Sequence, residues 1–155
     1  MKFGISKCMA TCFFGDLATL QSQDFVLGGE KVPVGETYRY LGVLIDNEFS
    51  VKRIVDDRAE SAQRSLFANQ PLLMARSIPM WTRVTVFKAC VYPVITYGAE
   101  IMGAWDQRIL HKLERLVSLG MRMIVGKGAK STSVAATTLH RELNIPHVPA
   151  VCRGN

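Results

Sequence analysis

The stretch "ETYRYLGVLID", residues 36–46, decides the fold of this chain. Tyr38 and Tyr40 lie on one side of an extended chain, and a nearly unbroken apolar run then continues to Asp46. Aromatic and β-branched residues favour strands, so the stretch predicts one. Gly42, in its middle, indicates a bulge, a bend or a close approach of another backbone. The alternative is an ordinary core strand in which Gly42 only serves packing.

The residues before this stretch also indicate extended structure. Residues 1–13 alternate well enough to predict a strand, and residues 15–24 are typical of a loop. Residues 25–34 predict two short strands around a turn at Gly28-Gly29-Glu30-Lys31. Pro33 indicates an edge strand or the end of a strand.

The residues after this stretch have a helical period. Ser50 is a natural N-cap for a helix that is expected to end before Pro71. Pro79 suits the first turn of a second helix, Pro93 is expected to kink its last turns, and Gly98 to stop it. The tail after the last predicted helix has no evident core role. The predicted helices span about residues 50–69, 77–98, 106–125 and a short segment within 131–146.

Each of the three longer predicted helices has an apolar face for a shared core. The order of elements therefore predicts an α+β fold, a small antiparallel β-sheet or hairpin followed by a bundle of three or four α-helices. The apolar faces consist of Val51, Val55, Ala59, Ala62 and Leu66; of Val84, Phe87, Val91 and Ile95; and of Ile109, Leu113, Leu116, Val117, Gly120 and Ile124.

The charge of the chain, +6 in total, is unevenly distributed. Residues 1–50 hold four Lys and Arg against six Asp and Glu, a net of −2. Residues 51–100 hold seven against four, a net of +3, and residues 101–155 hold eight against three, a net of +5. This gradient favours a polyanionic partner, although moderately basic surfaces also serve solubility alone.

The third predicted helix carries a basic stripe opposite its apolar face. Its members are spaced by 4, 3 and 7 residues, and Lys127 and Lys130 extend the charge beyond the helix. Such a stripe can follow the phosphates of a nucleic acid. The alternative is an ordinary solvated face, but the absence of balancing acids on the stripe favours binding. The stripe consists of Arg108, Lys112, Arg115 and Arg122.

Signals for chemistry are weak in this sequence. Asp56 and Asp57 are neighbours on a helix, so they point about 100° apart and do not converge on a metal; we expect them to be surface charges. The chain has no catalytic triad, no phosphate-binding glycine loop and no histidine spacing of a metal site, so no catalytic residue, metal ligand or small-molecule cofactor is expected. The four cysteines are expected to be reduced thiols of an intracellular protein, most of them buried. No segment is apolar for long enough to predict a membrane span.

Two motifs in the correct order resemble the C-terminal part of reverse transcriptases from non-LTR (LINE-type) retrotransposons. The first is Tyr-x-Tyr-Leu-Gly-Val, at residues 38–43. The second is Pro-x-x-x-Tyr-Gly-x-Glu, at residues 93–100. The resemblance extends to about residue 146. It implies three parts: the end of the palm and a primer-grip-like β region at 1–48, a helical thumb-like domain at 49–130, and a short helix and tail at 131–155 that begin a connection region.

The resemblance also implies roles for individual residues. Tyr40, Leu41 and Gly42 would form the turn region of the primer-grip hairpin and hold the 3′ end of the primer, where a glycine lets the backbone approach nucleic acid. Lys7 matches a palm lysine close to the phosphates of the incoming nucleotide. The helices would cradle an RNA–DNA or DNA template–primer duplex through its backbone, using Arg53, Arg64, Arg108, Lys112, Arg115 and Arg122.

The resemblance has a gap at the catalytic centre. The aromatic-x-Asp-Asp box of the family would precede Lys7, so the fingers, most of the palm and the divalent metal (Mg²⁺) that the palm binds are expected elsewhere in a full enzyme. We therefore expect no polymerase activity from this chain alone. Two alternatives stay open: a non-catalytic nucleic-acid-binding or protein-interaction module that kept this fold, and a helical scaffold whose charge serves solubility only.

Overall fold

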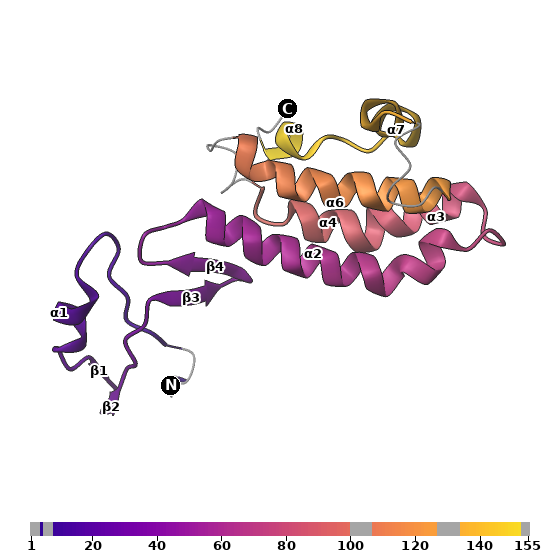
Figure 1. Cartoon of the computed structure of the whole chain (residues 1–155). Helices are drawn as coiled ribbons and strands as arrows, with labels where there is room; N and C mark the ends of the chain where they lie inside the picture. Colours follow the sequence, from indigo (N-terminus) through magenta and orange to yellow (C-terminus); the bar gives the residue numbers. More distant parts are fainter. Residues whose placement is uncertain (1–3, 5–7, 100–106, 127–133, 153–155) are drawn as a thin grey trace. The chain divides into compact units, whose positions relative to one another are not determined.

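A computed structural model describes residue 4 and residues 8–99, 107–126 and 134–152 (Figure 1). Its contacts divide the chain into two compact units, Met1–Ile54 and Val55–Asn155. The first unit contains two antiparallel hairpins and the second consists of helices, so the predicted α+β class is confirmed. The predicted division at residues 48 and 130 stays a prediction.

The first unit differs from the prediction before its hairpins. In the described part of residues 1–13 the extended structure is limited to a parallel bridge between Ala10 and Val34, so the predicted strand is wrong there. The predicted loop at 15–24 contains a short helix, α1 (Leu17–Gln21). Asp16 caps α1, since its carboxylate accepts hydrogen bonds from Thr19 Oγ1 (2.7 Å) and from the Ala18 N–H (3.0 Å). These two bonds lower the pKa of Asp16.

The first hairpin is confirmed, but its turn is two residues long and not the predicted four, because Glu30 and Lys31 belong to a strand. Strands β1 (Val26–Leu27) and β2 (Glu30–Lys31) pair antiparallel on either side of Gly28-Gly29. Both glycines have positive φ, 61° and 86°, which a two-residue hairpin turn of this kind requires.

The second hairpin corrects the single strand that the residues alone predicted through Gly42, and it agrees with the hairpin turn that the resemblance implies at this motif. Residues 36–46 form two strands, β3 (Thr37–Tyr40) and β4 (Val43–Asp46), paired antiparallel with Tyr40 opposite Val43. Leu41 and Gly42 form the turn, with φ of 47° and 81°. The apolar run is continuous across this turn, so the alternation of residues did not reveal the reversal of the chain.

Asp46 joins the second hairpin to the next helix. Its residue is only 2% exposed, and its Oδ1 accepts a hydrogen bond from the Ser50 N–H at 2.5 Å. The predicted N-cap position is confirmed, because α2 (Val51–Met74) begins directly after Ser50. The predicted end is wrong, because α2 continues through Pro71. Leu73, in the turn that follows, is fully buried, and this burial offsets the backbone hydrogen bond that proline cannot make.

The second predicted helix is present as three consecutive helical segments. They are α3 (Met80–Val86), the π-helix η2 (Phe87–Val91) and α4 (Tyr92–Thr96). The irregularity expected from Pro93 therefore takes the form of a π-helical segment just before the proline. Gly98, with φ of 77°, lies beyond the end of α4, as predicted.

The C-terminal helices are α6 (Gln107–Val125), α7 (Ala136–Leu143) and α8 (Val148–Cys152). Gly126, with φ of 78°, follows α6, which ends at the predicted residue, Val125. The tail was predicted to have no core role, and this is wrong: Val148 is 0% and Cys152 is 6% exposed. Among the cysteines, which are all free, Cys152 alone is buried, so the prediction that most of them are buried is also wrong.

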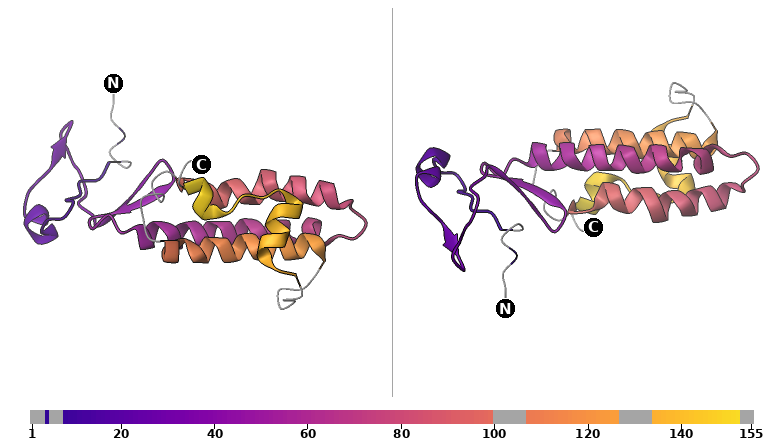
Figure 2. Two further views of the ribbon diagram at one scale, coloured as in Figure 1. Left: turned by 90° about the horizontal axis from the view of Figure 1, so that it is seen from above. Right: turned by 90° about the horizontal axis from the view of Figure 1, so that it is seen from below.

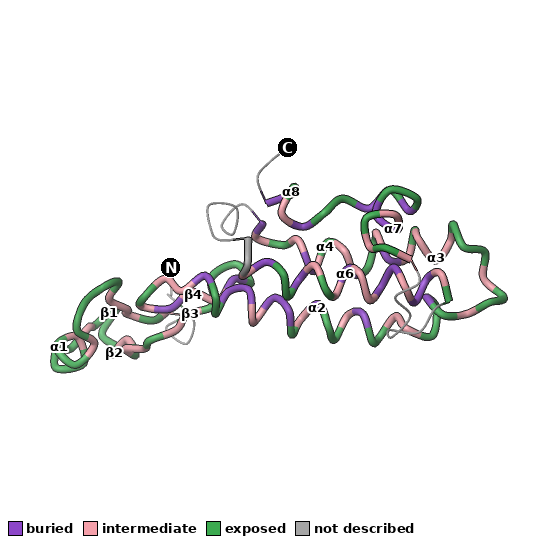
Figure 3. Tube along the Cα trace, turned by 45° about the horizontal axis from the view of Figure 1, so that its top comes forward, coloured by how far each residue is buried: buried purple, intermediate pink, exposed green. Residues whose placement is uncertain are grey.

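The core of the second unit lies between the long helices. Figure 2 shows α2, the α3–α4 segment and α6 side by side, with α7 and α8 packed against them. Figure 3 shows buried residues on their facing sides. All five predicted core residues of α2 are buried, whereas Val84, Ile109 and Leu116 are only half-buried. Phe87 is fully buried against Gly120: a Cβ at Gly120 would lie 2.2 Å from the Phe87 ring.

Candidate nucleic-acid interface

The turn between β3 and β4 presents an apolar tip. Tyr40 is 58% and Leu41 is 73% exposed, and Gly42 is also exposed. The Arg39 guanidinium donates a hydrogen bond to the Gly42 carbonyl at 3.3 Å, across the turn. The hairpin thus brings the three predicted primer-grip residues together at its exposed end.

Leu41 is an unusual residue for its position in this turn. A left-handed conformation is disfavoured for a residue with a Cβ by about 1–2 kcal/mol, and asparagine, aspartate and glycine are preferred there. Strain of this kind is found preferentially at functional sites. A hairpin whose only task was to reverse the chain would gain stability from Asn-Gly in place of Leu-Gly.

Arg53, in the first unit, has a structural partner. Its guanidinium lies 3.5 Å from Asp46 Oδ2, and this carboxylate is buried while the Arg53 side chain is 53% exposed. The two groups form an ion pair without a hydrogen bond, since Asp46 Oδ2 has no hydrogen-bond partner in the described part of the chain. Arg53 therefore compensates the buried charge of Asp46, and only its exposed part is available to a ligand.

Arg64 lies on the solvent side of α2. It is exposed and donates a hydrogen bond to Ser61 Oγ at 3.2 Å. Together with Glu60, Gln63 and Phe67 it lines a shallow depression on this helix. The depression combines a cation, an acid and an aromatic ring, and it has no convergent set of groups for catalysis.

The basic stripe of α6 is confirmed in part. Lys112 and Arg115 are exposed and Arg122 is half-buried. The expectation that no acid balances the stripe is wrong, because Lys112 Nζ lies 2.7 Å from Asp56 Oδ1 on α2. Some predicted residues lie outside the described part of the chain. These are Lys7, Lys127, Lys130 and Asp106, the residue at the start of the third predicted helix. The side chain of Arg108 also lies outside it.

Asp56 and Asp57 point to different partners. Asp56 pairs with Lys112, whereas Asp57 pairs with Arg58 at 3.1 Å. The expectation that the two do not converge is therefore confirmed. The expectation that both are surface charges is wrong for Asp57, whose side chain is 12% exposed. The Arg58 guanidinium also lies over the Tyr97 ring, 5.2 Å from its centre.

Sequence reasoning missed two polar groups of the second unit. Arg83 donates hydrogen bonds to the carbonyls of Ile124 (2.6 Å) and Leu73 (3.5 Å), near the C-terminal ends of α6 and α2. Glu114 lies against His140 and His147. The spacing of Arg83 from these carbonyls, 41 and 10 residues, has no local signature in the sequence.

Tyr92 gives the second unit a predictable response to alkaline pH. Its hydroxyl donates to the Pro146 carbonyl at 3.1 Å. Burial, and then the neighbouring Glu114 carboxylate and Cys152 thiol, raise the pKa of Tyr92 to about 12. Because the unfolded pKa is about 10, the folded chain retains a proton that the unfolded chain loses. The stabilisation is thus fully present below about pH 10 and is lost as the pH rises toward about 12.

We expect Tyr92→Phe to remove this loss. In urea denaturation of the full chain, the wild-type free energy of unfolding should fall more steeply above about pH 10 than that of Tyr92→Phe. The exposed Tyr40→Phe serves as the control and should retain the wild-type slope. Equal slopes for wild type and Tyr92→Phe would contradict the assignment.

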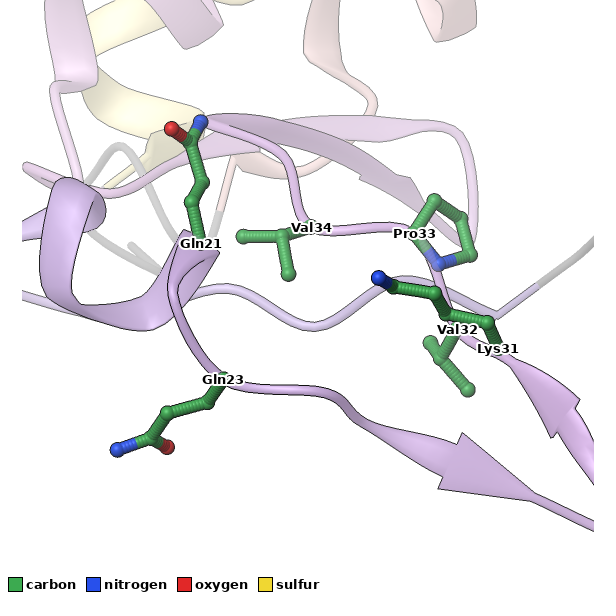
Figure 4. Close-up of a pocket in the computed structure, with 6 residues that line it drawn as sticks. All are labelled: Gln21, Gln23, Lys31, Val32, Pro33 and Val34. Atoms are coloured by element: carbon green, nitrogen blue, oxygen red, sulfur yellow. The ribbon is translucent and has the colours of Figure 1, made fainter.

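A second depression lies in the first unit (Figure 4). Its only charged residue, Lys31, pairs with Asp24. Nothing in it resembles a catalytic or cofactor site. It is lined by Gln21, Gln23, Lys31, Val32, Pro33 and Val34.

No helix in the described ranges is both long enough and apolar enough to cross a bilayer.

Most of this chain is similar to a part of two proteins of Drosophila melanogaster. The probable RNA-directed DNA polymerase from transposon X-element is 28% identical over 122 residues, which are 77% of this chain and 13% of that protein. The RNA-directed DNA polymerase from mobile element jockey is 23% identical over 122 residues, again 77% of this chain and 13% of that protein. No protein-family model and no solved structure matches the chain. The two relatives confirm the resemblance to non-LTR retrotransposon reverse transcriptases.

Proposed function

We propose that this chain is part of a retrotransposon RNA-directed DNA polymerase and holds the template–primer duplex. The support is its similarity to two transposon polymerases, of whose length it spans 13%. In this proposal the β3–β4 hairpin is the primer grip and the helices of the second unit are the thumb. The function is positional: holding reactants in the correct geometry removes an entropic part of the reaction barrier.

The observation that carries the proposal is the turn at Leu41-Gly42. The turn is exposed, Leu41 has a strained conformation, and both turn residues belong to the Tyr-x-Tyr-Leu-Gly-Val motif. An exposed tyrosine and leucine offer apolar surface to the sugar and base of a primer terminus. Gly42 lets the backbone come close, since it has no Cβ.

The thumb role is supported by the exposed cations of α2 and α6. Arg64, Lys112 and Arg115 extend into solvent, where each can contact a phosphate. The Lys112–Asp56 pair does not prevent this, because its side chains are 55% and 43% exposed. A pair of this kind contributes only about 0–1 kcal/mol, and a phosphate can replace Asp56 as the partner of Lys112.

The chemistry in this proposal belongs to residues outside this chain. Mg²⁺ would be bound by palm carboxylates elsewhere in the full enzyme, where it would stabilise the charge that develops during nucleotide transfer. Lys7 would contribute positive charge near the phosphates of the incoming nucleotide. The full chain is accordingly proposed to bind nucleic acid without extending a primer.

A matched pair of charge variants tests the thumb. The triple variant Arg108→Gln/Lys112→Gln/Arg115→Gln removes three charges from α6. The control, Lys31→Gln/Arg76→Gln/Arg141→Gln, removes three charges from exposed residues elsewhere. In fluorescence-anisotropy titrations with a short RNA–DNA hybrid, the α6 variant should bind at least about tenfold more weakly than the control, on the order of 1.4 kcal/mol.

The comparison distinguishes binding by a specific surface of α6 from attraction by the net charge of the chain. Both variants have the same net charge, so equal losses of affinity would show that charge alone drives binding and would contradict the thumb assignment. Circular dichroism spectra of both variants establish that each is folded.

A further inference from the structure

Three side chains from separate segments of the second unit converge on one point. Glu114 comes from α6, His140 from α7, and His147 from the residues just before α8. Their ligand atoms all lie within 4.8 Å of one another. Glu114 Oε1 is 2.9 Å from His140 Nε2 and 2.6 Å from His147 Nδ1. From the sequence we expected no metal site, because the histidines do not have the spacing of a recognised one.

His140 is held in a defined orientation. Its Nδ1 lies 2.7 Å from the Ile145 carbonyl, which can only accept a hydrogen bond, so Nδ1 carries a proton. In the neutral ring the lone pair is then on Nε2, which is directed at the Glu114 carboxylate. The side chain is 4% exposed, and Nε2 has no hydrogen-bond partner in the described part of the chain, although Glu114 Oε1 is close to it.

A neutral His140 thus places two electron-pair donors against each other in a buried site. Such an arrangement is unfavourable unless a positive charge lies between the two atoms. A cation bound at this point would supply that charge. His147 is placed beside it as a further ligand, because its ring is stacked on that of His140 with centroids 3.7 Å apart.

We propose that Glu114, His140 and His147 bind one zinc ion. Imidazole nitrogens and a carboxylate oxygen are ligands that zinc accepts, and three protein ligands leave a fourth position for water. The surroundings have the second layer of hydrogen bonds typical of such sites. The Ile145 carbonyl orients His140, and the Val148 N–H donates to Glu114 Oε2 at 2.9 Å.

The geometry requires the ligands to move apart and the His147 ring to turn out of its stack on His140. With Zn–ligand distances of about 2.0–2.1 Å, tetrahedral ligands are roughly 3.3 Å apart, somewhat farther than the present Glu114–histidine distances. His147 can supply most of this movement, because its side chain is 47% exposed. The bound ion would connect α6, α7 and the start of α8, so it would stabilise the C-terminal part of the unit.

The test is calorimetric titration of the full, chelator-treated chain with Zn²⁺ in the presence of a reductant. We expect one ion per chain and a rise in melting temperature on binding. His147→Gln and Glu114→Gln should each lower the affinity by about 10- to 100-fold or more. His111→Gln, on the exposed side of α6, is the matched control and should bind as the wild type does.

Cobalt substitution identifies the ligands. Co²⁺ should give the visible bands of a four-coordinate site without a thiolate-to-cobalt charge-transfer band. A charge-transfer band would assign the ion to cysteines and overturn the proposal. Absence of Zn²⁺ binding by the folded wild type, or an unchanged affinity in folded His147→Gln, would also overturn it. Because the His147 side chain is about half exposed, its variant keeps the test valid even if Glu114→Gln unfolds.

Discussion

Phe87→Ala is expected to lower the free energy of unfolding by about 3–5 kcal/mol. Phe87 is fully buried in the π-helical segment η2, and its ring packs against Gly120 of α6. Alanine would leave a cavity between two helices that backbone movement cannot close easily. Urea denaturation of the full chain, followed by circular dichroism, measures the change.

Three further substitutions make this prediction specific to the contact. Phe67→Ala removes a ring that is 46% exposed on α2, and it should cost far less. Gly120→Ala introduces a methyl group against the Phe87 ring and should cost about 1–3 kcal/mol. Phe87→Leu should recover part of that cost when combined with Gly120→Ala. Equal costs for Phe87→Ala and Phe67→Ala would contradict the described packing.

Local patterns predicted the parts of the fold that local interactions determine. The apolar stripe of α2 from Val51 to Leu66 is buried as its spacing required. Gly28-Gly29 forms a hairpin turn because both residues accept positive φ at no steric cost. Gly126 ends α6 for the same reason.

Other elements depend on contacts that are distant in the sequence. Pro71 does not end α2, because the burial of Leu73 outweighs the local penalty of a proline. The tail forms α8 because the Val148 side chain is buried in the core and its N–H donates a hydrogen bond to Glu114, 34 residues earlier. Leu41 adopts a turn conformation that its residue type disfavours, so propensity predicted a continuous strand instead.

In the candidate site, too, local patterns predicted some features, whereas others depend on contacts between residues far apart in the sequence. Helical spacing found the exposed face that carries Lys112 and Arg115. It could not find Asp56 as the partner of Lys112, because these residues are 56 positions apart. It also could not bring Glu114 together with His140 and His147, which meet only through the packing of α7 and α8 on α6.

Salt dependence is expected to be the largest effect on nucleic-acid binding. If the chain neutralises four phosphates, the logarithm of its affinity should fall with the logarithm of salt at a slope of roughly −3 to −4. This corresponds to a loss of about 100-fold between about 50 and 200 mM salt. Each phosphate contact removed by substitution on α6 should make the slope shallower by about one.

The measurement that tests the central claim most directly compares the affinity of the full chain for two duplexes of the same sequence, an RNA–DNA hybrid and a DNA duplex. Both are measured at the same salt concentration. A reverse transcriptase thumb meets an A-like duplex with 2′-hydroxyls, which proteins recognise by shape. We therefore expect tighter binding to the hybrid, with the steep salt slope described above. Equal affinity for both duplexes would favour a general nucleic-acid-binding module. No binding at low salt by the folded chain would contradict a role in holding the template–primer duplex.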